Sequence, residues 1–291
     1  PGIAMFEAMV GRPVLGTIPY FRDVYVDEED GLTLQPEFGI TPSESTVDIA
    51  VIVLPRMSNF TDFVSLQHET GVHLRYAYSP NELGCPDAVI IPGTKNTIED
   101  FLYLRSKGWV EKIKSLVAEG KMLVGICGGF QMLGTSIRDP HHVESNIAQI
   151  EGLGFFQIKT EMSHEKTTRQ RSLNLIANNF INQEIQVQGY QIHMGETVLQ
   201  ESYHALFRES PALGIISEDC GIWGTYLHGI FDNDDFRLVF VNHLRQRKGL
   251  SILTKGLNYA EFRQKQFNKL AEILHESLDL NRIYDVLFKC L

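Results

Sequence analysis

Short apolar runs alternate with amphipathic segments through the middle of the chain. Residues 48–54 are almost continuously apolar after Asp48, as expected for a strand buried on both faces. Further strand-like runs lie at 73–78, 88–91 and 122–126, with helix-like segments at 62–70, 98–106 and 108–119. This alternation at short intervals predicts an α/β fold: an open, mostly parallel sheet with flanking helices.

The pattern changes after residue 152. Strand-like runs at 155–160, 172–176 and 187–192 follow one another without long helices between them, which predicts a small antiparallel patch. Residues 222–227 again resemble a strand, and 234–248 form an amphipathic helix. Residues 258–287 predict a long C-terminal helical tail.

The first 46 residues differ in character from the rest of the chain. Residues 4–10 predict a helix and 14–19 a strand, whereas 22–46 are rich in Asp, Glu, Pro, Thr and Ser and predict a linker. The chain also begins with Pro1 and not with Met. We therefore expect residues 1–46 to be the end of a preceding domain and a linker, 47–250 the main domain, and 251–291 the tail.

Composition narrows the class of protein. Hydrophobic residues make up 43% of the 291 and charged residues 21%, which is typical of a globular protein. The formal charge of −10 argues against a nucleic-acid partner, and no apolar run approaches the ~20 residues of a membrane span. Four cysteines, Cys85, Cys127, Cys220 and Cys290, are scattered without metal-ligand spacing. They predict reduced thiols in a cytoplasmic protein that holds no metal.

One cysteine has an unusual setting. An apolar strand leads into Gly125, Cys127 follows two residues later, and Gly128 and Gly129 open a helix-compatible segment. This is the spacing of a nucleophile elbow, in which a strained strand-to-helix turn excludes side chains on its neighbours. A cysteine after a strand is usually a packed small hydrophobe, but packing alone does not require flanking glycines. The pattern predicts that Cys127 is a nucleophile.

A thiol nucleophile needs a base, and two histidines are candidates by position. His228 follows the strand at 222–227, and the carboxyl edge of an open α/β sheet is where such folds place their sites. His193, at the end of the predicted strand 187–192, is the competitor. A third strand leaves the core through Pro92 and Gly93, and a backbone N–H there could complete an oxyanion hole with that of Gly128.

Together these residues resemble class I glutamine amidotransferase domains. Gly125, Cys127, Gly129 and Gln131 match the family's Gly-x-Cys-x-Gly-x-Gln pattern. Within the family the resemblance is to the cobyric acid synthase type, and it extends over about residues 11–248. The segments that carry it are 13–20, 56–63, 92–97, 125–134, 189–195 and 224–232.

The resemblance implies a flavodoxin-like fold and roles for individual residues. It implies that His228, not His193, is the base, that Gln131 helps to hold the substrate glutamine, and that the loop at Gly93 is the oxyanion loop. It also implies that residues 1–20 are the last helix and strand of an N-terminal ATP-binding synthetase domain. ATP and magnesium are then expected in that domain, with no cofactor in this chain.

The implied chemistry is hydrolysis of glutamine by a Cys127 thiolate. In the intact enzyme type, the ammonia amidates a corrinoid, cobyrinic acid a,c-diamide, at positions b, d, e and g in cobalamin biosynthesis, on carboxylates activated by ATP. One departure concerns the base: most class I members have a carboxylate two residues after the histidine, and this chain has Ile230. We therefore expect an under-oriented His228, and slow hydrolysis without the synthetase domain.

The sequence leaves three different functions open. A sister enzyme, cobyrinic acid a,c-diamide synthase, has the same glutaminase chemistry, although the stretch 224–231 argues against it. A catalytically silent interaction module would keep the elbow but only bind a partner. A thiol hydrolase of the α/β type would place an acid between cysteine and histidine in chain order.

Overall fold

The computed structural model describes residues 1–21, 24–25, 43–199 and 203–289, and the chain divides into two compact units. The larger comprises Asp30–Leu257, and the smaller comprises Pro1–Glu29 with Asn258–Leu291. Most of the predicted linker, and Cys290, lie outside the described residues. The predicted boundaries after residues 46 and 250 stay a prediction.

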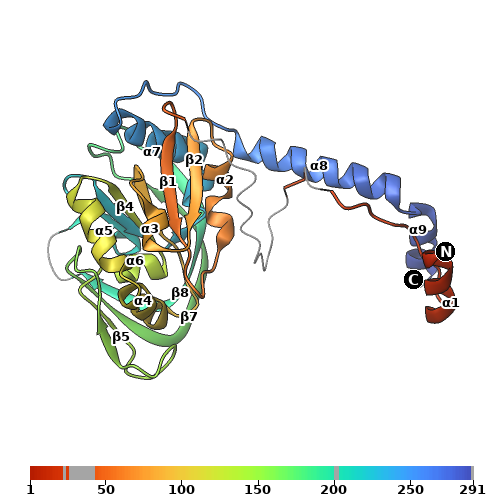
Figure 1. Ribbon diagram of the computed structural model, residues 1–291, viewed down its shortest axis with the longest axis horizontal. Coiled ribbons are helices and arrows are strands. Elements are labelled where there is room, and N and C mark those ends of the chain that lie inside the picture. The colour runs from red at the N-terminus through yellow and green to blue at the C-terminus, as the bar shows by residue number, and fades with distance from the viewer. Residues whose placement is uncertain (22–23, 26–42, 200–202, 290–291) are drawn as a thin grey trace. The chain divides into compact units, whose positions relative to one another are not determined.

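Within the described part of the larger unit, a seven-stranded sheet carries the core (Figure 1). In spatial order its strands are β2 (Val72–Ala77), β1 (Val47–Ile52), β3 (Ala88–Ile91), β4 (Met122–Ile126), β11 (Ile222–Thr225), β10 (Gly214–Ile216) and β9 (His204–Ala205). The first five are parallel, and at one edge β10 pairs antiparallel with β11 and β9 pairs antiparallel with β10. The predicted open, mostly parallel sheet is confirmed.

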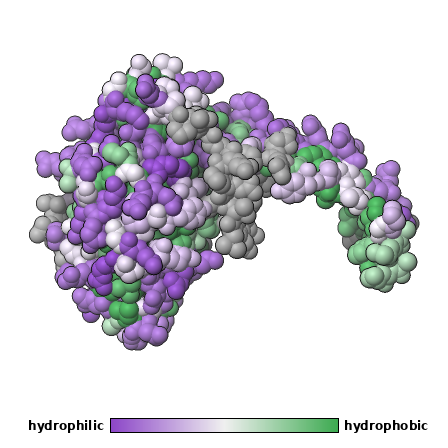
Figure 2. All heavy atoms as spheres, in the orientation of Figure 1, coloured by the Kyte–Doolittle hydropathy of each residue, from purple (hydrophilic) through white to green (hydrophobic). Residues whose placement is uncertain are grey.

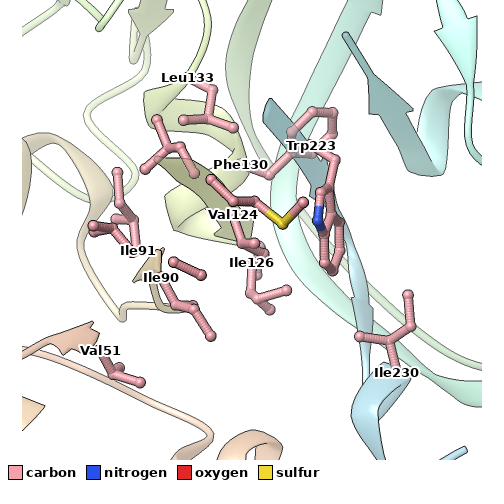
Figure 3. Close-up of a cluster of buried hydrophobic side chains, with 14 of the residues drawn as sticks. Val51, Ile90, Ile91, Val124, Ile126, Phe130, Leu133, Trp223 and Ile230 are labelled. Atoms are coloured by element: carbon pink, nitrogen blue, oxygen red, sulfur yellow. The ribbon is translucent and has the colours of Figure 1, made fainter. Parts of the chain in front are cut away.

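Helical segments connect and cover these strands. They are η2 (Phe60–Phe63), α2 (Val64–Gln67), α3 (Pro80–Leu83), α4 (Thr97–Ser106), α5 (Trp109–Ala118), α6 (Gly128–Met132), η3 (Pro211–Leu213), η4 (Ile230–Asp232) and α7 (Asp234–Arg247). Strands β3 and β4 are buried along their whole length, which explains their continuous apolar sequence. Figure 3 shows how Ile90, Ile91, Val124 and Ile126 from these strands gather with Phe130 of α6.

A second sheet of five strands, counted over the described residues, lies beside the elbow. Its order is β12 (Leu227–His228), β8 (Gln186–Leu199), β7 (Ile158–Asn174), β5 (Ser136–Arg138) and β6 (Gln149–Glu151). The long antiparallel β7–β8 ribbon confirms an antiparallel patch, but the predicted strand lengths were wrong (Figure 1). Much of β7 is exposed, so it lacks the apolar alternation by which a half-buried strand is recognised.

The smaller unit is helical, which confirms the predicted helical tail and corrects one other prediction. Its described residues form α1 (Gly2–Val10), α8 (Tyr259–Ser277) and α9 (Leu280–Lys289), so the tail is made of two helices. They separate at Leu278, which is extended, and the next residue, Asp279, donates its backbone N–H to the Leu15 carbonyl at 2.7 Å. The predicted strand at 14–19 is reduced to one isolated bridge, between Gly16 and Leu278. No helix in the described ranges is long and apolar enough to cross a membrane.

A buried ion pair anchors α7 to the segment after α2. Glu69 Oε2 accepts from Arg237 Nε at 2.6 Å, and both side chains are 0% exposed. Arg237 also contacts Asp234 Oδ1 at 2.8 Å, so Glu69→Leu leaves the buried guanidinium with fewer partners but not alone. The substitution also removes the acceptor of the Leu257 backbone N–H, and we expect it to lower the free energy of unfolding by about 3 kcal/mol. Urea denaturation followed by fluorescence of the buried Trp109 and Trp223 measures this loss.

The matched control is Glu161→Leu, which removes a carboxylate from the exposed pair with Arg138. An exposed pair contributes about 0–1 kcal/mol, so this variant should unfold close to the wild-type urea midpoint. Equal losses in the two variants would contradict the special role of the buried pair.

Candidate active site

The predicted elbow forms between β4 and α6. Cys127 has φ 50° and ψ −107°, a region that side-chain-bearing residues rarely occupy. A Cβ on Gly129 would lie 2.0 Å from the Ile91 carbonyl oxygen, and one on Gly125 would lie 2.7 Å from the Gly129 carbonyl oxygen. Both glycines are therefore required by close backbone approach, as the sequence pattern predicts.

Cys127 is 8% exposed, and its thiol faces the neighbouring sheet. Sγ lies 3.4 Å from the Ile192 carbonyl oxygen of β8, to which the thiol donates. Cys85 is an exposed free thiol and Cys220 a buried one, and neither has glycines on both sides at the elbow spacing. Burial raises the pKa of the Cys220 thiol. Among the three cysteines in the described residues, Cys127 is thus the one at the elbow.

His228 is held at the end of the parallel sheet by a buried carboxylate. Its Nδ1 donates to Asp62 Oδ2 at 2.7 Å, and Asp62 Oδ1 accepts the Gly229 backbone N–H at 2.8 Å. A carboxylate only accepts, so the proton of the neutral ring lies on Nδ1. In this neutral form the buried Nε2 is the unprotonated nitrogen, and it is therefore the atom that can receive a proton.

Opposing effects act on the protonation of His228. Burial lowers its pKa, whereas the charge and hydrogen bond of Asp62, and the neighbouring Cys127, raise it. The net pKa lies well above the ordinary value of 6.5. The Tyr190 ring stacks on the imidazole with centroids 5.1 Å apart, and its hydroxyl accepts from Asn59 at 2.6 Å. The ring is therefore fixed both at its Nδ1 edge and on its face.

The loop after β3 lies against both Cys127 and His228. A Cβ on Gly93 would be 3.3 Å from His228 Cε1 and 3.6 Å from Cys127 Cβ. A Cβ on Gly128 would be 3.3 Å from the backbone nitrogen of Thr94. The backbone of Gly128 and that of the Gly93 loop thus lie close together beside Cys127, and their role as an oxyanion hole stays a prediction.

Gln131 lies behind the elbow in a polar network. It is 3% exposed, and its Oε1 accepts from Thr97 Oγ1 at 2.9 Å. It also hydrogen-bonds Tyr226, whose pKa is raised by burial and partly lowered by that bond. Tyr226 in turn shares a 2.5 Å hydrogen bond with Thr197. In the described structure Gln131 therefore supports the wall beside Cys127, and its contact with a substrate stays a prediction.

Asp62 is the residue that sequence reasoning missed. It lies 166 positions before His228, and only the fold brings the two together. The one available signal was its place in the segment 56–63 that contributes to the family resemblance. Ile230, where the carboxylate was sought, is 2% exposed and belongs to the apolar core (Figure 3). The expectation of an under-oriented His228 is therefore wrong.

His193, the other candidate base, does not lie at the strand end where the sequence predicted it. His193 lies within β8 and not at its end, since the strand continues to Leu199. Its Nδ1 lies 2.7 Å from the Gly195 carbonyl oxygen and its Nε2 lies 2.5 Å from Gln191 Nε2. Both ring nitrogens are therefore engaged, which leaves neither available to receive a proton from the thiol.

Metal ligands do not gather in the part of the chain that is described. Among those residues, no group of three or more His, Cys, Asp or Glu side chains is arranged to hold an ion. The absence of a metal and of a cofactor from this chain stays a prediction.

The family model that this chain matches and its curated relatives indicate the same family. Residues 48–236 match the CobB/CobQ-like glutamine amidotransferase domain. Cobyric acid synthase from Caldanaerobacter subterraneus subsp. tengcongensis is 42% identical over 305 aligned residues, which cover 99% of this chain and 58% of that protein. Cobyric acid synthase from Nostoc punctiforme is 40% identical and covers 96% of this chain. The chain spans 58% and 57% of the length of these two relatives.

A solved structure gives independent support for the fold. PurLQS from Thermotoga maritima superposes with a TM-score of 0.54 at 16% sequence identity, over 68% of this chain and 99% of that one. At this identity the likeness concerns the arrangement of strands and helices.

Proposed function

The chain belongs to the CobB/CobQ-like glutamine amidotransferase family, and from this premise we propose that Cys127, His228 and Asp62 hydrolyse the side-chain amide of glutamine. The observation that carries the proposal is the buried pair of His228 and Asp62 directed at the elbow cysteine. Nucleophile, base and orienting carboxylate are the three groups that covalent amide hydrolysis requires.

The reaction begins when the Cys127 thiolate attacks the amide carbon, and the proton from the thiol resides on His228 Nε2. The carbonyl oxygen becomes an oxyanion beside the N–H of Gly128 and the Gly93 loop, and Gln131 supports this wall. His228 then gives its proton to the departing nitrogen, which leaves as ammonia and yields a thioester. Water, deprotonated by His228, attacks the thioester, and glutamate and the free thiol are released.

The whole protein is proposed to be a cobyric acid synthase, since this chain spans little more than half of relatives with that name. In this proposal a synthetase portion binds ATP and magnesium, and ammonia amidates a corrinoid there. Exposed apolar residues on α1, among them Met5, Phe6 and Met9, are suited to contact such a portion (Figure 2). Cobyrinic acid a,c-diamide synthase remains the alternative substrate assignment.

Asp62 removes the support for a silent interaction module and for a thiol hydrolase. The silent interaction module rested on the missing carboxylate at Ile230, and Asp62 supplies one to His228. A thiol hydrolase of the α/β type has its acid between cysteine and histidine, whereas Asp62 precedes both in the chain.

Glutamate release from glutamine by the purified chain tests the proposal. Hydrolysis that is faster than in buffer, and absent with asparagine, is the expected result. Absence of hydrolysis both alone and with the synthetase portion, ATP and corrinoid would reject it.

We expect Asp62→Asn to lower kcat/KM for glutamine by roughly 10²-fold, because an amide NH₂ facing Nδ1 favours the tautomer that is protonated on Nε2. The variant also lacks the negative charge that raises the pKa of His228. Because that raised pKa keeps His228 protonated to higher pH, the alkaline fall in activity should move to lower pH in the variant. The rate of glutamate release against pH measures both effects.

The control is Asp219→Asn, which makes the same change at an exposed turn residue. It should retain the wild-type rate and pH profile. A profile that does not move in Asp62→Asn would contradict the assigned role of the carboxylate.

A further inference from the structure

A chain of hydrogen bonds next to the site fixes the orientation of an amide. Gln191 Oε1 accepts from Arg171 Nε at 3.0 Å and from Arg171 Nη2 at 2.9 Å. A guanidinium only donates, so the amide oxygen faces Arg171 and the NH₂ group faces away from it. Gln191 is 5% exposed, and flipping its amide would place two donors against the guanidinium.

The fixed amide determines the tautomer of His193. The Gln191 NH₂ lies 2.5 Å from His193 Nε2, and an amide nitrogen only donates, so Nε2 must be an unprotonated acceptor. Nδ1 lies 2.7 Å from the Gly195 carbonyl oxygen, which only accepts, so Nδ1 carries the proton. The neutral ring protonated on Nδ1 is the form that satisfies both contacts.

The groups that face His193 also oppose a positive charge. Burial lowers its pKa, the Gly195 carbonyl partly raises it, and the charges of His228 and Arg171 lower it further. The ring of Tyr226 stacks on the imidazole with centroids 3.9 Å apart. Ile192, the residue before His193 in β8, accepts the hydrogen bond of the Cys127 thiol at its carbonyl oxygen, 3.4 Å from Sγ.

We propose that Gln191, oriented by Arg171, is a positioning residue that keeps His193 uncharged, so that His228 is the imidazole that carries the proton beside Cys127. A second imidazolium at this place would repel the protonated form of His228. The proposal rests on the glutaminase function proposed above, whereas the protonation state of His193 can be measured without it.

The direct test is the ring state of His193 in the purified chain with ¹⁵N-labelled histidine. Two-bond ¹H–¹⁵N correlation spectra distinguish the two neutral tautomers and the imidazolium, and His193→Gln identifies the His193 signals by their loss. Wild type should show the neutral form protonated on Nδ1, still uncharged at about one pH unit below the ordinary pKa of ~6.5. An ordinary titration, or a proton on Nε2 of the neutral ring, would overturn the proposal.

Gln191→Glu tests the cause. A carboxylate at this position can accept from Arg171 and from a protonated His193 Nε2, so the pKa of His193 should rise by at least about one unit. At His228 the new carboxylate and a charged His193 oppose each other, so the titration of His193 in the ¹H–¹⁵N spectra is the measurement that decides, and an unchanged pKa of His193 would contradict the role of Gln191. The control is Gln188→Glu, the same change at an exposed position of the same strand, which should not alter the titration of His193.

The outcomes separate the two proposals. If wild type hydrolyses glutamine but His193 titrates normally, the inference on Gln191 fails and the glutaminase proposal stands. If His193 stays in the neutral form protonated on Nδ1 but glutamine is never hydrolysed, the proposed glutaminase function fails. The role assigned to Gln191 in that reaction then fails with it. If Gln191→Glu does not fold, the wild-type spectra still decide the state of His193.

Discussion

Cys127→Ser should abolish glutamine hydrolysis, with a loss of at least about 10³-fold, or about 4 kcal/mol of transition-state stabilisation. A serine hydroxyl at this place has a much higher pKa than a thiol and is hardly ionised near neutral pH. The fold should persist, because the substitution changes one buried atom and keeps the hydrogen-bond donor that faces Ile192. Glutamate release and the urea midpoint measure these two expectations.

The matched control is Cys220→Ser. Cys220 is also buried and also has positive φ, 56°, but it lies outside the site. This variant should therefore retain glutamine hydrolysis. When the chain is joined to the synthetase portion proposed above, free ammonia should still support amidation by Cys127→Ser. Loss of the ammonia-dependent reaction together with the glutamine-dependent one would mean that the role of Cys127 is structural.

His228→Ala should lower glutamine hydrolysis on the order of 10²–10⁴-fold, which is the usual contribution of general acid–base catalysis. His193→Ala should lose less than about tenfold, because both His193 nitrogens are engaged by Gln191 and Gly195 and neither can accept the proton of the thiol. The two kcat/KM values for glutamine, measured side by side, give the comparison.

Thermal unfolding of the two variants controls for misfolding. A small loss in His228→Ala combined with a large one in His193→Ala would reverse the assignment of the base. Equal large losses in two folded variants would contradict the inference that His193 stays uncharged and outside proton transfer.

The sequence predicted the parts of the protein whose signals are local. The strands β3 and β4 were predicted with the bounds observed, because strands buried on both faces leave continuous apolar runs. The elbow at Cys127 was predicted for a similar reason: its glycines are required by neighbours within a few residues and by one strand, β3. Constraints of this kind can be recognised in a short stretch of sequence, because they determine residue types at neighbouring positions.

The parts that the sequence could not predict depend on contacts between distant segments. Asp62 is an acidic residue at the beginning of a helical segment, where acidic residues are common, and nothing local distinguishes it from a surface residue. The length of β7 was hidden because much of the strand is exposed. The strand at 14–19 was wrongly predicted because its partner in the structure is a helix end, at Leu278, and not another strand.

The segment that begins at Asn59 and includes Asp62 holds the base in place before substrate binds. Three hydrogen bonds around the imidazole do this: Asp62 accepts one from the ring and one from the Gly229 backbone N–H, and Asn59 donates one to the hydroxyl of the stacked Tyr190. A movement of this segment away from β12 would break all three together, at a cost of several kcal/mol when about 0.5–3 kcal/mol is counted for each. Conformations in which His228 is displaced from its place beside Cys127 are therefore scarcely populated, and the imidazole is held in position before any substrate binds.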